Sequence, residues 1–288
     1  MTNDIVLRLD NTSLSQYTNV SSQTSSTARV GIVAPAFPTT DTAHEWNIPQ
    51  RMSTRSTVTA RPHDFPLAVA HAAVLVIDMQ RDFLDPDGGC PRLLQISPET
   101  LAGVREIIPR IARLLSWARS HGISVIYTRE ASRPDLSDLS GSKRLRYENA
   151  GYPVGTSGPL GRLLVRGESG CAVIPELAPQ QGDLEWDKPA QSAFVGTDLE
   201  ACLRARGITH LLLTGVTTQC CVLATYRHAA DLGFFPLLLE DCCAAFDPLE
   251  HDAAIRVITS EGGAVGWVTT SDQLWRVALT NRGETDEE

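Results

Sequence analysis

Residues 210–222, His-Leu-Leu-Leu-Thr-Gly-Val-Thr-Thr-Gln-Cys-Cys-Val, join a buried strand to a helix. His210 to Val216 is an apolar run of strand length, and Cys220 to Leu232 spaces apolar residues at helical intervals before Gly233. The turn between them places the first N–H groups of a helix, which have no partner within it, at the end of a strand. Because the helix dipole adds partial positive charge there, such a corner favours a negative group.

Two adjacent cysteines stand on this turn, and one of them is a candidate nucleophile. A helix N-terminus lowers the pKa of a cysteine, and the thiolate is the attacking species, so we expect the thiol to ionise readily. The unpaired N–H groups, those of Thr217 and Cys221 for instance, can hold the oxyanion of a tetrahedral intermediate. Cys220 is the rival nucleophile; neighbouring helical side chains point about 100° apart, so we expect only one to face a cleft.

From Ala72 onward, strands with little polar alternation are separated by helix-length segments. The expected strands are 73–77, 123–128, 184–187, 210–216, 235–240 and 264–269; the expected helices are 98–121, 198–206, 220–232 and 251–261. This order predicts one α/β domain over about 66–280, with a doubly wound, mostly parallel sheet and helices on both faces. The segment 140–170 reads as a long loop, which is typical of a lid or a subunit contact.

The ends of the chain differ in composition from this domain. Serine and threonine dominate residues 11–27, and four prolines interrupt the stretch that follows. We expect residues 1–65 to form a poorly ordered or draped extension, either without function or wrapped around a partner subunit. Residues 281–288 form an acidic tail.

Composition excludes several classes of protein. The formal net charge of −9 and the pI near 5.3 argue against a nucleic-acid surface. No apolar run approaches the roughly 20 residues of a membrane span, and the first ten residues do not resemble a signal peptide. Seven cysteines, an odd number, suit reduced thiols. We therefore expect a cytoplasmic protein that binds neither membrane nor nucleic acid.

Three reactive side chains follow strands of the expected sheet. Asp78 follows the first strand, Lys188 follows the strand that begins at Leu184, and Cys221 lies on the turn described above. Ligands of open parallel sheets bind at the carboxyl ends of the strands. A carboxylate there can take the thiol proton and return it to a leaving amine, while an ammonium steadies developing negative charge.

The motifs around these residues resemble the isochorismatase-like cysteine hydrolases. They are Ile-Asp-Met-Gln-x-Asp-Phe from Ile77, Lys-Pro with Ser-Ala-Phe-x-Gly-Thr-x-Leu over 188–199, and Gly-Val-x-Thr-x-x-Cys-Val from Gly215. The resemblance covers 66–280. It implies a triad of Asp78, Lys188 and Cys221, a cis peptide between Val216 and Thr217, amidase activity on small amides or ureido compounds, and a homodimer or homotetramer.

Within that family, residues 128–143, 162–167, 174–177 and 239–244 are most similar to biuret hydrolases and related ureido-amidases. This resemblance implies a biuret-like substrate and ammonia release. Gln191 and Glu261 stand where biuret hydrolases tend to have Lys and Gln, so both can line the pocket. Glu130 and Arg133 are candidates for gripping a polar substrate, or for pairing with each other. Phe83 and Gln219, inside the motifs, are further substrate-binding candidates.

No metal and no cofactor are expected. The seven histidines are isolated, and none forms an Asp-x-His or His-x-x-x-His pair. Glycine-rich phosphate loops are missing from the sequence. Two alternatives to an amidase remain: an enol ether hydrolase of the isochorismatase type, which does not require the thiol, and a family member without catalysis that binds a protein partner through its N-terminal extension.

Overall fold

The protein was analysed as a computed structural model, which describes residues 56–283, with side chains described up to Val277. A six-stranded sheet forms its centre, in the order β10-β9-β8-β3-β4-β7, and all neighbouring strands are parallel. The strands are β3 (Ala72–Ile77), β4 (Ser124–Glu130), β7 (Leu184–Lys188), β8 (His210–Val216), β9 (Phe235–Ala244) and β10 (Trp267–Thr269).

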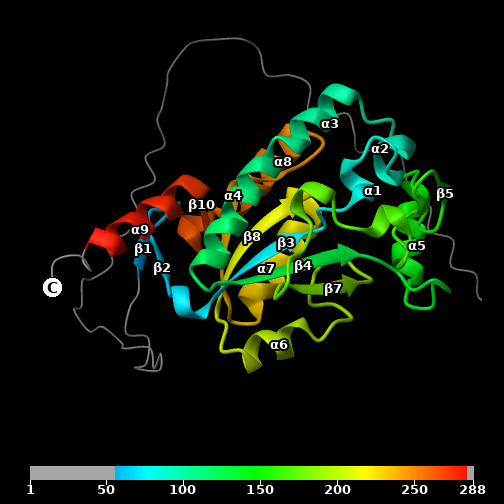
Figure 1. The fold of residues 1–288 in the computed structure, drawn as a ribbon. Coiled ribbons are helices and arrows are strands. Elements are labelled where there is room, and N and C mark those ends of the chain that lie inside the picture. The colour runs from blue at the N-terminus through cyan, green and yellow to red at the C-terminus, as the bar shows by residue number, and fades with distance from the viewer. Residues whose placement is uncertain (1–55, 284–288) are drawn as a thin grey trace, which may run out of the picture. The chain divides into compact units, whose positions relative to one another are not determined.

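Helices cover both faces of this sheet (Figure 1). They are α1 (Arg81–Leu84), α2 (Gly89–Leu93), α3 (Pro98–Arg105), α4 (Ile107–Ser120), α5 (Gly141–Asn149), α6 (Leu199–Ala205), α7 (Leu223–Asp231), α8 (Pro248–Ile258) and α9 (Ser271–Gly283). Alternate residues of β3 belong to the two separate apolar cores: Val74 packs with α4, whereas Leu75 packs with α6 and α7. The doubly wound parallel sheet predicted from the sequence is confirmed.

Smaller elements surround the sheet. They are the antiparallel pairs β1 (Ser56–Val58) with β2 (Phe65–Leu67) and β5 (Ser157–Gly158) with β6 (Gly161–Arg162), and the 3-10 turns 69–71, 169–171, 175–177 and 261–263. Strand β1 lies before the expected domain start at residue 66, and β2 spans it. Val58 of β1 and Phe65 of β2 are buried in the core. The rest of the expected extension, residues 1–55, and the tail from 284 lie outside the described residues, so the domain boundaries stay a prediction.

Two expected helices are built differently. The helix expected over 98–121 is divided at Glu106 into α3 and α4. Pro109 explains the break, because proline has no N–H to offer the carbonyl of residue 105 and its ring clashes there. The helix expected from Cys220 begins instead as a π-helical turn, Thr218–Val222, before α7 continues it.

The segment 140–170 is not a structureless loop. It contains α5, whose first turn is capped by the Ser140 hydroxyl accepting from the N–H of Lys143, and the β5–β6 pair. The capped helix fixes the direction of Lys143 and Tyr147, which are both buried. This segment therefore delivers ordered side chains toward the carboxyl edge of the sheet.

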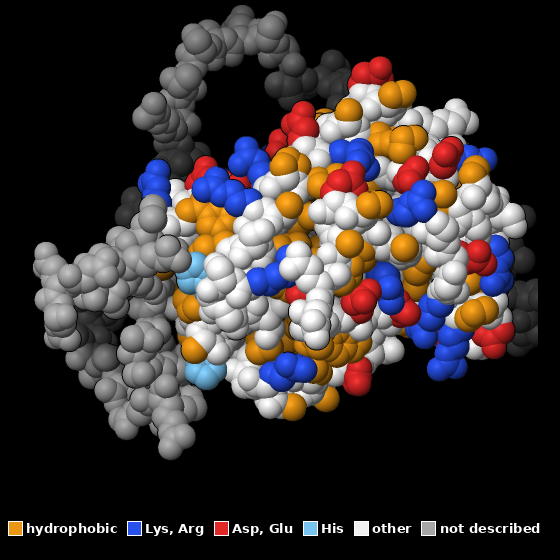
Figure 2. Space-filling view, in the orientation of Figure 1, with side chains coloured by type: hydrophobic (Ala, Val, Ile, Leu, Met, Phe, Trp, Pro, Cys, Tyr) orange, Lys and Arg blue, Asp and Glu red, His pale blue; other side chains and the backbone are white. Residues whose placement is uncertain are grey.

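The expectations that the protein has no membrane span and no nucleic-acid surface concern its helices and the distribution of its surface charge. Within residues 56–283, no helix is both long and apolar enough to cross a bilayer. On the face that Figure 2 shows, acidic and basic side chains are interspersed rather than gathered by sign.

Candidate active site

Asp78 lies directly after β3, where the chain turns sharply. Its φ of 54° is uncommon for a residue with a side chain, and its N–H donates to Thr128 O over 3.0 Å. The Thr128 hydroxyl donates to Asp78 Oδ1 over 3.0 Å. Burial raises the pKa of Asp78, and the neighbouring Lys188 ammonium offsets part of this effect. Asp78 is therefore a stronger proton acceptor than an ordinary carboxylate.

Lys188 ends β7 and is completely buried. Its Nζ lies 2.7 Å from Asp78 Oδ2 and donates to Ala190 O over 2.9 Å. Burial alone lowers the pKa of Lys188, but the charges of Asp78, Cys221 and Glu130 together raise it above its usual value. The lysine is thus a fixed ammonium beneath the site.

Cys221 is placed by the turn after β8. Gly215 has a φ of 113°, and a Cβ atom on it would lie 2.0 Å from Ile77 O, so only glycine allows β8 to approach β3 here. The peptide bond between Val216 and Thr217 is cis, as the resemblance implies. The π-helical turn that follows directs the Cys221 sulfur toward the ends of β3 and β4.

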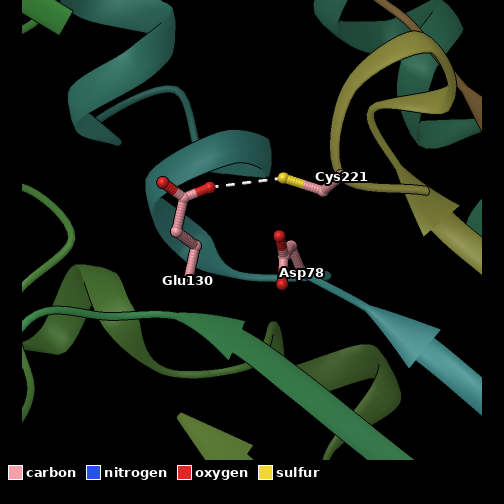
Figure 3. A group of neighbouring side chains, drawn as sticks. All are labelled: Asp78, Glu130 and Cys221. Atoms are coloured by element: carbon pink, nitrogen blue, oxygen red, sulfur yellow. Dashed lines mark hydrogen bonds between the residues drawn. The ribbon is translucent and has the colours of Figure 1, made fainter. Parts of the chain in front are cut away.

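The sulfur faces two carboxylates (Figure 3). Cys221 Sγ donates to Glu130 Oε2 over 3.2 Å, and one oxygen each of Asp78 and Glu130 lies within 4.8 Å of the sulfur and of the other. In Figure 3 the Glu130 and Cys221 side chains point toward each other, with Asp78 beside them. The acid, the amine and the thiol expected from the sequence therefore meet in one place.

The expectation that this thiol ionises readily is wrong. A hydrogen bond with Cys220 and complete burial raise the pKa of Cys221 well above its usual value, while the Lys188 ammonium offsets part of this rise. The helix-terminus effect does not prevail, because the sulfur is dry and stands beside two carboxylates. Cys221 rests as a thiol that donates its proton.

Glu130, at the end of β4, is a buried acceptor rather than a loose surface group. The Tyr147 hydroxyl donates to its Oε1 over 2.5 Å, and Lys143 Nζ lies 2.6 Å from the same oxygen. Gln80 holds its backbone, since Gln80 Oε1 accepts from the Glu130 N–H over 2.7 Å. Burial works to raise the pKa of Glu130, but the ammonium groups of Lys188 and Lys143 outweigh it and lower the pKa to about 2. Glu130 therefore stays ionised.

A cavity of about 710 Å³ opens above these groups. Cys221 and Glu130 lie in its wall, whereas Asp78 and Lys188 are completely buried and lie outside the lining. Its aromatic lining residues are Phe83, Tyr147, Tyr152 and Phe246. Cys220 also lines the cavity, so the expectation that only one cysteine faces the cleft is wrong. Of the two thiols, Cys221 donates to the Glu130 carboxylate, and its role as the nucleophile stays a prediction.

The substrate-binding candidates divide into two groups. Phe83, Glu130 and Gln219 line the cavity. Arg133, Gln191 and Glu261 are not among its lining residues: Arg133 and Glu261 are exposed, and Gln191 is half-buried.

Of the two alternatives for Glu130 and Arg133, a shared grip on the substrate or a pair between themselves, the pair is wrong, because Glu130 pairs with Lys143 and Arg133 is exposed. Sequence reasoning missed Lys143, Tyr147 and Tyr152 as site residues. Their only signal was the length of the segment 140–170, because α5 brings Lys143 and Tyr147 to the site and the loop after α5 brings Tyr152.

The site also bears on metal binding. Ligand atoms of Asp78, Glu130 and Cys221 lie close enough together to share an ion. Their two carboxylates, however, are already paired with the ammonium groups of Lys188 and Lys143, which a cation would have to displace. These residues are thus a poor fit for a metal, and its absence stays a prediction.

A buried acid, lysine and cysteine at the carboxyl edge of a parallel sheet define the class of isochorismatase-like hydrolases. The isochorismatase domain model matches residues 72–273, and the chain belongs to this family. The ureidoacrylate amidohydrolase RutB of Azorhizobium caulinodans is 34% identical over 216 residues, covering 73% of this chain and 92% of that protein. RutB of Caulobacter segnis is also 34% identical, covering 74% and 87%.

Solved structures of a cysteine hydrolase and of an amidase are also similar to this chain. A cysteine hydrolase from Pseudomonas syringae pv. phaseolicola superposes with a TM-score of 0.63 at 28% identity, covering 78% of this chain and 97% of the other. The N-carbamoylsarcosine amidase of Thermoplasma acidophilum superposes with a TM-score of 0.52 at 25% identity, covering 70% and 96%.

Proposed function

We propose that this isochorismatase-family protein is a cysteine amidohydrolase that cleaves a C–N bond of a small amide or ureido compound and releases ammonia. The observation that carries the proposal is the position of the Cys221 thiol, which lies in a cavity wall directly above the buried Asp78–Lys188 pair. The ureidoacrylate amidohydrolases and the N-carbamoylsarcosine amidase support amide chemistry, since both act on such bonds by name.

The first half of the reaction forms a covalent intermediate. Asp78 takes the thiol proton as the Cys221 sulfur attacks the substrate carbonyl carbon, and the carbonyl oxygen gains the negative charge. Asp78 suits this role because its pKa is raised, whereas Glu130 remains ionised and is the poorer base. Asp78 then returns the proton to the leaving nitrogen, the C–N bond breaks, and ammonia departs.

The second half regenerates the enzyme. A water molecule attacks the thioester carbon and gives its proton to Asp78, the C–S bond breaks, and the sulfur recovers its proton from Asp78. Lys188 stays charged throughout the reaction. Whenever Asp78 is ionised, its carboxylate therefore faces an ammonium nitrogen 2.7 Å away. Such preorganised charge lowers the barrier because it needs no rearrangement during the reaction.

The turn after β8 is the proposed oxyanion hole. Thr217 and Cys221 both line the cavity, and their N–H groups stand at the start of the helical segment. Backbone N–H groups at a helix start stabilise an oxyanion without carrying a full charge. One turn would then supply both the nucleophile and the oxyanion donors.

A biuret-like ureido compound is the proposed substrate. A homodimer or homotetramer in the cytoplasm remains our prediction for the whole protein. Two alternatives to the amidohydrolase make different predictions. An enol ether hydrolase does not require the Cys221 thiol, and a non-catalytic binding protein would hydrolyse no amide or ureido compound.

An ammonia-release screen tests the proposal and identifies substrates. It covers biuret, ureido acids, N-carbamoyl amino acids, nicotinamide and maleamate, with the wild type and the Cys221→Ala variant side by side. We expect ammonia from at least one ureido compound with the wild type and none above background with the variant. Full turnover by Cys221→Ala refutes the proposal.

A further inference from the structure

The polar lining of the active-site cavity carries one sign of charge. Three of its described lining residues are acidic, namely Glu130, Asp247 and Glu250, and none is Lys or Arg. Asp247 and Glu250 are exposed at the start of α8, so they stand at the outer part of the cavity. A ligand entering toward Cys221 therefore passes two acidic side chains.

The two nearby lysines do not compensate for these acids. Lys143 and Lys188 are buried, and each is already paired: Lys143 Nζ lies 2.6 Å from Glu130, and Lys188 Nζ lies 2.7 Å from Asp78. The inner group of two carboxylates and two ammonium groups is thus balanced. Among the described residues, Asp247 and Glu250 have no Lys or Arg partner: Asp247 caps α8 by accepting from the Leu249 N–H, and Glu250 accepts from the neutral Gln219 amide, so their negative charge is not balanced by a cation.

The cavity also presents hydrogen-bond acceptors from Gln219 and Glu130. Gln219 Nε2 donates to Glu250, which leaves Gln219 Oε1 buried with no partner among the described residues. Glu130 Oε2 accepts from the Cys221 thiol and loses that donor when the thiol reacts. Ureido and primary amide groups are rich in N–H donors, which suit such acceptors. Aromatic walls from Phe83, Tyr147, Tyr152 and Phe246 suit planar or cationic groups.

We propose that the cavity selects neutral or cationic ureido compounds and amides and discriminates against substrates that carry a carboxylate. This inference rests on the proposed function and narrows it. It also predicts that this chain discriminates against ureidoacrylate, the compound in the names of its relatives, because acrylate denotes a carboxylate and the described lining offers no Lys or Arg to receive one. Glu250 is the specificity-determining residue that the structure points to.

Selective alkylation of Cys221 tests the charge preference without any knowledge of the substrate. Iodoacetamide is neutral, and iodoacetate has similar size but carries a carboxylate. The ratio of their rates at Cys221, measured by peptide mass spectrometry in a Cys220→Ser background, is compared with the ratio for 2-mercaptoethanol. Relative to 2-mercaptoethanol, we expect the preference of Cys221 for iodoacetamide over iodoacetate to be larger by about three- to tenfold for each of the two outer acids, Asp247 and Glu250.

Variants of the outer acid make the test specific. In that background, Glu250→Gln should lower the preference by roughly three- to tenfold, and Glu250→Lys should lower it further. The matched control is Glu200→Gln on α6, which is exposed, pairs with Arg204 one turn away and is not among the lining residues. This control should leave the ratio unchanged. A ratio in the Cys220→Ser protein that is equal to or below that of 2-mercaptoethanol overturns the proposal.

Measurement of turnover provides a second test, which is independent of the alkylation ratio. N-carbamoylglycinamide carries a carboxamide where N-carbamoylglycine carries a carboxylate. Hydrolysis of the ureido group that both share is followed by the appearance of glycinamide or glycine, and we expect the neutral compound to have the higher kcat/KM for this step, by about tenfold or more. A preference for the acid contradicts the charge selection but leaves the cysteine amidohydrolase intact. Turnover that survives in Cys221→Ala contradicts the proposed function, whereas the alkylation ratio still decides the charge selection.

Discussion

Replacing Glu130 by Gln should destabilise the fold because Glu130 is the carboxylate that holds Lys143. The substitution keeps the size of the side chain and an oxygen for the Tyr147 hydroxyl, but it removes the charge 2.6 Å from Lys143 Nζ. Lys143 would retain its bond to Pro189 O and its contact with the Tyr147 ring, but no carboxylate partner among the described residues. Breaking one side of a buried pair costs about 3–5 kcal/mol.

The pKa of Glu130 gives an independent magnitude. A carboxyl whose pKa falls from 4.5 to about 2 on folding contributes about 3 kcal/mol to the free energy of unfolding. Because the folded pKa is depressed, this contribution is complete above about pH 5 and disappears as the pH falls toward about 2. Both routes lead to a loss of about 3 kcal/mol at pH 7.

Urea denaturation of the wild type and Glu130→Gln, at pH 7 and at several values down to pH 3, measures this difference. The difference between the two proteins should shrink steadily below about pH 4.5. Glu185→Gln is the control, because Glu185 makes a partly exposed pair with Arg129 that is worth at most about 1 kcal/mol.

The double variant Glu130→Gln/Lys143→Met should lose clearly less stability than the sum of the two single variants, since it leaves no unpaired ammonium. A loss below about 1 kcal/mol for Glu130→Gln at pH 7, or a difference that does not change with pH, refutes this account of Glu130.

The remaining predictions concern the thiols and Tyr147. Cys221→Ala should lose ammonia release by on the order of a thousandfold or more, whereas Cys220→Ser should stay within about tenfold of the wild type; equal losses would contradict the choice of nucleophile. At pH 7–8 iodoacetamide should modify Cys220 before Cys221, because Cys220 is half-buried whereas Cys221 is buried and its raised pKa keeps the thiol protonated; peptide mass spectrometry decides the order, and faster labelling of Cys221 contradicts it. Tyr147→Phe should cost about 2 kcal/mol in urea denaturation, since a hydrogen bond to the ionised Glu130 is lost; an unchanged midpoint contradicts a structural role for that bond.

Those features of the site that depend on one strand end could be predicted from the sequence. Asp78 follows β3 directly, Lys188 ends β7 and Cys221 lies on the turn after β8, and the parallel sheet brings all these carboxyl ends to one edge. The apolar runs of β3 and β8 predict this sheet because a strand buried on both faces has no polar alternation. The meeting of the three side chains therefore follows from topology.

Features that depend on distant segments could not be predicted in this way. Lys143 and Tyr147 reach Glu130 from α5, and no local pattern shows where a helix of the segment 140–170 will dock. Arg133 is close to Glu130 in sequence and was the more obvious partner. The exposed position of Arg133 and the burial of Lys143 are results of tertiary packing.

The state of the Cys221 thiol shows the same limit. A helix start predicts a lowered pKa from local geometry, yet burial and two neighbouring carboxylates act in the opposite direction. The π-helical turn is equally invisible in the spacing of apolar residues. The local sequence pattern predicted the position of the Cys221 sulfur on the turn after β8, but not the burial and the carboxylates that raise its pKa.

Capture of a covalent intermediate tests the central claim most directly. The protein is mixed with a ureido substrate found in the ammonia screen, quenched in acid within the first turnover, and digested for peptide mass spectrometry. The account predicts an acyl adduct on Cys221, formed together with one equivalent of ammonia and missing in Cys221→Ala. An adduct on Cys220, or ammonia release by Cys221→Ala at the wild-type rate, contradicts it.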